Sequence, residues 1–60
     1  MSRKINYNDT VMAKVGGYNG KQGKVTMVAD INGTKRYYVE FADKQVKWYT
    51  YFQLLKIKND

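Results

Sequence analysis

The chain lacks cysteine and histidine, and these two absences exclude much familiar enzyme and metal chemistry. Without cysteine there is no disulfide framework and no thiol nucleophile, and without histidine there is no imidazole base. The usual ligands of a zinc site are missing for the same reason. We therefore expect no bound metal and no other cofactor.

Long apolar runs are also missing. No stretch of about 18 apolar residues occurs, and the N-terminal residues carry charge without the apolar segment of a secretory signal. The sequence therefore predicts a cytoplasmic protein with no membrane partner. On this interpretation the Asn-x-Thr triplets at Asn8 and Asn32 are chance matches to the glycosylation motif.

Acidic residues are few, because 5 aspartates and glutamates stand against 11 lysines and arginines, for a net charge of +6. The chain also carries six tyrosines, one tryptophan and two phenylalanines. Cations for phosphates and rings for stacking are typical of nucleic-acid binders, so RNA or DNA is the expected partner. The alternative is that these aromatics merely suit the half-buried strands of a small β domain.

Hydrophobicity alternates with a period of two along most of the chain, which indicates strands rather than helices. Val28 breaks this alternation, and a β-bulge in the second strand is the simplest explanation. The dipeptide Asn32-Gly33 is a strong hairpin signal. The expected strands are 10–15, 23–30, 35–41, 45–50 and 54–57, with a turn at 42–44 and a 3₁₀ turn at 51–53.

Five short antiparallel strands with a 3₁₀ turn before the last one predict an all-β fold, a small five-stranded antiparallel SH3-like barrel. We expect the barrel over residues 9–57, a flexible segment at 1–8 and a frayed end at 58–60. A monomer is favoured, and an oligomer stays open. The predicted core comprises Val11, Ala13, Val15, Val25, Met27, Tyr37, Val39, Phe41, Val46, Trp48, Leu54 and Ile57.

The loop between Val15 and Val25 combines four glycines with two lysines. Glycine permits positive φ and close backbone approach, so this density indicates a tight, shaped loop with a basic surface suited to phosphates. Its Gly20-Lys21-Gln22 portion differs from a nucleotide-binding P-loop, since the glycine spacing is one residue short and Gln22 replaces the magnesium-binding Ser or Thr.

The same loop carries a family resemblance, in the pattern Val15, Gly17, Gly20, Lys21, Gly23, Val25 preceded by Asp9-Thr10-Val11. This pattern resembles the KOW motif of SH3-like barrels in ribosomal proteins and NusG-type transcription factors, over residues 9–37. The resemblance implies that Gly23 lets the second strand begin in close contact with the first. It also implies that the loop at 17–22 faces RNA or a protein partner.

The closing segment, Val46-x-Trp48-Tyr49 followed by Leu54-x-Lys56-Ile57, is similar in spacing to the last strands of the plasmid-borne type II dihydrofolate reductases. Lys47 and Trp48 replace the glutamine and isoleucine of that family, so the similarity implies a shared architecture rather than a shared reaction. No pair of carboxylates is placed by the sequence to share a proton or a metal. We therefore predict that the protein is not an enzyme.

The candidate binding residues are cations and tyrosines at expected outward positions. The cations would contact phosphates and the tyrosines would stack on bases or contact sugars. The strand positions are Lys14, Lys24, Arg36, Tyr38, Lys47 and Tyr49, with Tyr18 and Lys21 on the adjoining loop.

Protein recognition is the competing interpretation, because Tyr, Trp and Arg favour protein interfaces as well as nucleic acid. A small basic chain of this kind would suit a phage or mobile-element product that docks on a host nucleic-acid enzyme. It would equally suit an accessory subunit of a larger complex.

Overall fold

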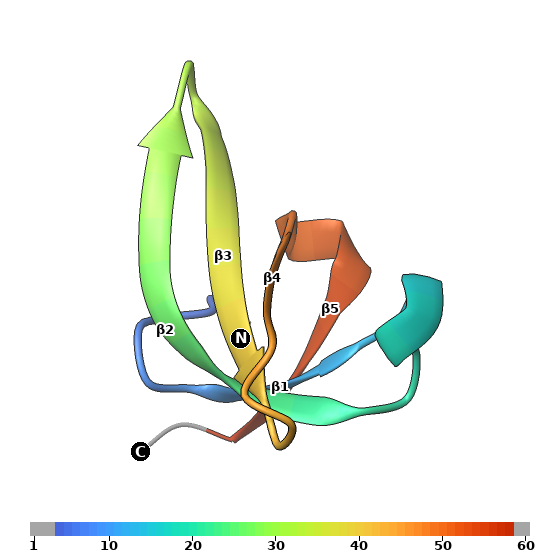
Figure 1. The fold of residues 1–60 in the computed structure, drawn as a ribbon. Helices are drawn as coiled ribbons and strands as arrows, with labels where there is room; N and C mark the ends of the chain where they lie inside the picture. The colour runs from blue at the N-terminus through green and yellow to red at the C-terminus, as the bar shows by residue number, and fades with distance from the viewer. Residues whose placement is uncertain (1–3, 59–60) are drawn as a thin grey trace.

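The computed structural model describes residues 4–58, which form one antiparallel sheet with the strand order β4-β3-β2-β1-β5 (Figure 1). The elements are β1 (Thr10–Ala13), η1 (Gly16–Tyr18), β2 (Gln22–Ile31), β3 (Thr34–Phe41), β4 (Val46–Tyr49), η2 (Tyr51–Gln53) and β5 (Leu54–Lys58), where η denotes a 3₁₀ turn. The all-β prediction is confirmed. The sheet is open, with β4 and β5 as its two ends, so the barrel is loose.

The β2–β3 hairpin contains the two longest strands of the fold, and its tip extends beyond the other strands in Figure 1. Its turn is Asn32-Gly33, with φ of 53° and 81° at the two residues. Positive φ at both central positions is what a two-residue hairpin turn requires. The turn therefore sets Ile31 opposite Thr34 and fixes the register of the hairpin as far as Met27 opposite Tyr38.

The predicted bulge lies in β2 between Val25 and Met27. Val25 is opposite Val39 and Met27 is opposite Tyr38, so Thr26 is the additional residue. Because the bulge precedes Met27, this side chain is exposed, while Val28 packs against the core. The prediction of Met27 as a core residue is therefore wrong.

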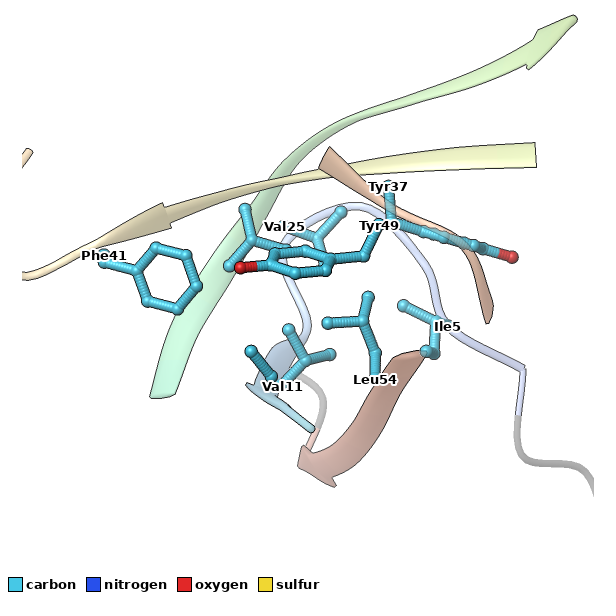
Figure 2. Packing of buried hydrophobic residues seen from close by; sticks show 9 residues of the cluster. Ile5, Val11, Val25, Tyr37, Phe41, Tyr49 and Leu54 are labelled. Carbon is cyan, nitrogen blue, oxygen red and sulfur yellow. The ribbon is translucent and has the colours of Figure 1, made fainter. Parts of the chain in front are cut away.

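The hydrophobic core gathers side chains from every strand and from the N-terminal segment (Figure 2). The ring of Tyr49 lies among the other apolar side chains, nearly perpendicular to the Phe41 ring (83°) at a centroid distance of 6.3 Å. The buried set is Ile5, Val11, Ala13, Val25, Tyr37, Val39, Phe41, Tyr49 and Leu54.

The prediction for β4 is wrong in its choice of face. Trp48 and Val46, expected in the core, are exposed, whereas Tyr49, expected outside, is only 7% exposed. Side chains opposite each other in an antiparallel ladder lie on the same face of the sheet. Tyr49 is opposite the buried Tyr37, which places Tyr49 inside and its neighbour Trp48 outside.

Val15 and Ile57 are two further errors in the predicted core, since both are exposed. Val15 lies beyond the end of β1, where the alternation of that strand no longer applies. In β5 the inward position beside Ile57 is taken by Lys56, whose Nζ lies 3.3 Å from Oδ2 of the buried Asp9. An ion pair thus occupies the place that the pattern assigned to an apolar side chain.

The folded unit begins earlier than the predicted boundary at residue 9. Ile5 is 3% exposed and belongs to the core, and the Asn8 backbone N–H donates to the Val25 carbonyl at 2.8 Å. A single apolar residue in a polar stretch has no periodicity, so this packing has no signal in the sequence pattern. The remainder of the two predicted flexible ends, residues 1–3 and 59–60, lies outside the described residues, and Lys58 is the last residue of β5.

Gly23 occupies a place in β2 that has no room for a side chain. A Cβ on Gly23 would lie 2.6 Å from Val39 Cγ1 and 2.7 Å from the Glu40 carbonyl oxygen. Both atoms belong to β3, so the close approach of Gly23 is to the third strand. The KOW resemblance implied a close approach to the first strand instead. Gly17, by contrast, has no atom within 4 Å of the corresponding point.

We expect Gly23→Ala to destabilise the fold by about 1–3 kcal/mol, because the backbone oxygen of β3 cannot yield as a flexible side chain does. Gly17→Ala is the matched control and is expected to change stability by less than about 0.5 kcal/mol. Thermal unfolding followed by circular dichroism measures both. Equal tolerance of the two substitutions would contradict the close packing of β2 on β3.

Truncation of the two aromatic neighbours in β4 is expected to reduce stability to very different extents. Tyr49→Ala removes a ring from the core and should cost about 3–5 kcal/mol, enough to unfold a domain of this size. Trp48→Ala removes an exposed ring and should cost about 1 kcal/mol or less. Melting temperatures of the two variants test the assignment, and a larger loss for Trp48→Ala would reverse the faces of β4.

Candidate nucleic-acid interface

The outer face of β2, β3 and β4 carries a row of large side chains. Arg36 and Tyr38 alternate in β3 with buried residues, so they project from the face opposite the core. Trp48 is opposite Tyr38 on one side and Met27 is opposite it on the other. We call Met27, Arg36, Tyr38 and Trp48 the outer aromatic face.

Arg36 and Trp48 form a stacked pair within this face. The guanidinium carbon of Arg36 lies 4.3 Å from the centre of the Trp48 ring, a cation–π distance. Trp48 is 47% exposed and Met27 is 50% exposed. Exposed apolar side chains of this size on both sides of Tyr38 make this face a candidate interaction surface.

Lys24 lies on the same side of the sheet as the outer aromatic face, one row further along the ladder. It is opposite Glu40 in β3 and opposite Thr10 in β1. This part of the face therefore combines one cation with one carboxylate, and Arg36 adds a second cation. The sum is a mildly basic surface around exposed rings.

The glycine loop has a different arrangement, because Tyr18 attaches it to the turn between β3 and β4. The Tyr18 ring stacks on Phe41 with centroids 4.3 Å apart and an interplanar angle of 24°. Its hydroxyl donates a hydrogen bond of 2.7 Å to Oδ2 of Asp43. Lys47 Nζ lies 6.0 Å from the centre of the same ring.

The contact between Tyr18 and Asp43 shifts the pKa values of both side chains. The hydrogen bond from the Tyr18 hydroxyl lowers the pKa of Asp43, with a smaller contribution from the backbone N–H of Gln45. The same hydrogen bond raises the pKa of Tyr18, because it favours the protonated phenol, and desolvation adds to this effect. The hydrogen bond thus favours the protonated phenol of Tyr18 and the ionised carboxylate of Asp43, and these two forms together hold the loop against the turn.

The predicted site residues divide into separate groups. Lys24, Arg36 and Tyr38 share the outer face, while Tyr18, Lys21 and Lys47 surround the loop. The other two lie elsewhere: Lys14 is beside η2, where its backbone N–H donates to the Gln53 carbonyl at 2.9 Å, and Tyr49 lies in the core, where burial raises its pKa.

The predictions of Lys47 and Tyr49 as outward positions of β4 are therefore wrong, because each is opposite a buried residue of β3, and Trp48 lies outward instead. The predicted turn at 42–44 contained the signal for this exchange. Phe41 and Gln45 close this turn, because the Phe41 N–H donates a hydrogen bond of 3.0 Å to the Gln45 carbonyl. From that pair the register of the two strands places Tyr38 opposite Trp48. Counting outward from β3 would have assigned the face correctly.

Comparison of the chain with models of protein families, with curated proteins and with solved structures finds no match. Within residues 4–58 no helix has the length and apolar character needed to cross a membrane. In the same part of the chain, no three His, Cys, Asp or Glu side chains are grouped so as to hold a metal ion. The candidate interface is therefore defined by its geometry alone.

The Tyr18–Asp43 bond predicts a pH dependence of stability. A lowered carboxyl pKa adds stability that is present above the unfolded value, about 3.9, and is lost as pH falls through the folded one. A raised phenol pKa adds stability that is present below the unfolded value, about 10, and is lost as pH rises through the folded one. The bond should therefore stabilise the protein fully between those limits.

The measurement compares wild type with Tyr18→Phe, which keeps the ring on Phe41 and removes the donor. We expect wild type to melt higher at neutral pH and the difference to shrink toward both ends of the range. Tyr7→Phe, which removes an exposed hydroxyl, serves as control. A difference that does not vary with pH would contradict the bond.

Proposed function

We propose that this protein is a small nucleic-acid-binding module that uses the outer face of β2, β3 and β4. The observation that carries the proposal is the grouping of Arg36 and Lys24 with the exposed Trp48 and the half-buried Tyr38 on one side of the sheet. The net charge of +6 attracts a polyanion to the whole molecule. The resemblance of residues 9–37 to the KOW motif supports the same class of ligand.

In this proposal the cations contact phosphates, and these contacts give affinity without sequence preference. Arg36 and Lys24 do so on the outer face, and Lys21 does so from the loop edge. Lys47 and Lys14 make secondary phosphate contacts, because neither of them lies on the outer face. Tyr38 supplies a ring in the middle of the surface, with neighbours on both sides.

Protein recognition is the second candidate, and a separate observation favours it. Phe52 in η2 is 83% exposed and is held edge to face against Tyr51, with ring centroids 5.5 Å apart. A protruding ring of this kind can anchor a protein interface by entering a pocket of the partner. An accessory subunit or a phage product that docks on a host enzyme would use such an anchor.

Two lysines of the described chain make a matched test of the proposed function. Lys24→Gln removes a cation from the outer side, whereas Lys35→Gln removes one that alternates with Arg36 and lies off this face. Both variants lower the net charge equally. We expect Lys24→Gln to weaken binding and to reduce the slope of log affinity against log salt by roughly one unit, and Lys35→Gln to do neither.

Fluorescence anisotropy of labelled oligonucleotides over a series of salt concentrations measures these slopes. Equal effects of the two substitutions would mean that only net charge attracts the nucleic acid, which contradicts a site on this face. The absence of binding at low salt would overturn the proposed function and leave protein recognition, with Phe52 as its anchor.

A further inference from the structure

We infer that Trp48, stacked with Arg36, is a platform for an unpaired base, so that the ligand of the outer aromatic face is single-stranded nucleic acid. This inference rests on the proposed function and narrows it to one class of ligand. It also assigns the central contact to a residue outside the set of cations and tyrosines that the sequence indicated.

The exposure of Trp48 requires an explanation. Its side chain is held on a four-residue strand that is paired to β3, with Tyr38 directly opposite, so its position is fixed by the ladder. Tryptophan is the largest apolar side chain, and half of its surface remains in water. A rigid, exposed ring gains free energy when a second flat group covers it.

The class of ligand follows from which flat groups are accessible. In a duplex the faces of the bases are covered by their neighbours, and a protein reaches only the edges in the grooves and the phosphates. Groove edges are read by an inserted helix or ribbon, whereas this surface is the broad side of three adjacent strands of the five-stranded sheet. Unpaired bases present their faces and stack on exposed rings and on guanidinium planes.

Arg36 completes the platform. Its guanidinium carbon lies 4.3 Å from the centre of the Trp48 ring. A cation–π contact uses the charge of the guanidinium, whose five N–H donors can also bind a phosphate. One side chain can therefore hold the ring in place and contact the backbone of the same strand.

Trp48 is the sole tryptophan of the chain, which makes its fluorescence a direct probe of the platform. We expect oligothymidine and oligouridine to quench this emission on binding, because a stacked base covers the indole. A hairpin duplex with the same number of phosphates should bind more weakly and leave the emission nearly unchanged. Emission that stays constant at saturating oligothymidine would overturn the inference.

A pair of variants tests the contact itself. Trp48→Leu keeps an apolar side chain and removes the ring, and should lower affinity for oligothymidine by about 5- to 100-fold, the range for one stacked base, without changing the salt slope. Phe52→Leu is the control, since it removes an exposed ring in η2, outside the outer aromatic face, and should leave the affinity unchanged. Melting temperatures establish that both variants are folded.

The two proposals fail in distinguishable ways. Equal affinity for hairpin and single strand, with Trp48→Leu silent and Lys24→Gln still active, would overturn the stacking platform and leave a general phosphate-binding face. No binding of either probe at low salt would overturn both proposals.

Discussion

Val25 and Val39 are opposite each other across the β2–β3 ladder, and both side chains are completely buried. This pair fixes the register of β3, the strand that pairs with β2 on one side and β4 on the other. Once Val39 faces inward, alternation sends Tyr38 outward and aligns Trp48 with it. The core and the candidate site are therefore two consequences of one contact, since they lie on opposite faces of the same strands.

The sequence contained enough to predict the strands and turns, because these depend on local patterns. The Asn32-Gly33 turn, the bulge near Val28 and the 3₁₀ turn at 51–53 are all in the structure. The face of β4 was harder, since a strand of four residues carries apolar side chains on both alternations. Alternation with Val46 favoured Trp48 as the inward residue, and the cross-strand partner decided for Tyr49.

The parts of the site that the sequence did not reveal depend on contacts between distant residues. Nothing local to Tyr18 shows that its ring rests on Phe41, or that its hydroxyl reaches Asp43. The stacking of Arg36 on Trp48 joins two strands in the same way. The outward position of Arg36 was correctly predicted because alternation within β3 is unambiguous, whereas the outward position of Trp48 required the register of another strand.

The open sheet leaves β4 and β5 at its ends, and among the described residues no further strand pairs with either. Edge strands present unsatisfied backbone groups that invite pairing with another chain. Both edges are short, and Lys47 places a positive charge on β4, whereas the Lys56 ammonium of β5 is paired with Asp9. Two copies approaching by their β4 edges would bring like charges together, so Lys47 opposes aggregation of the protein with itself.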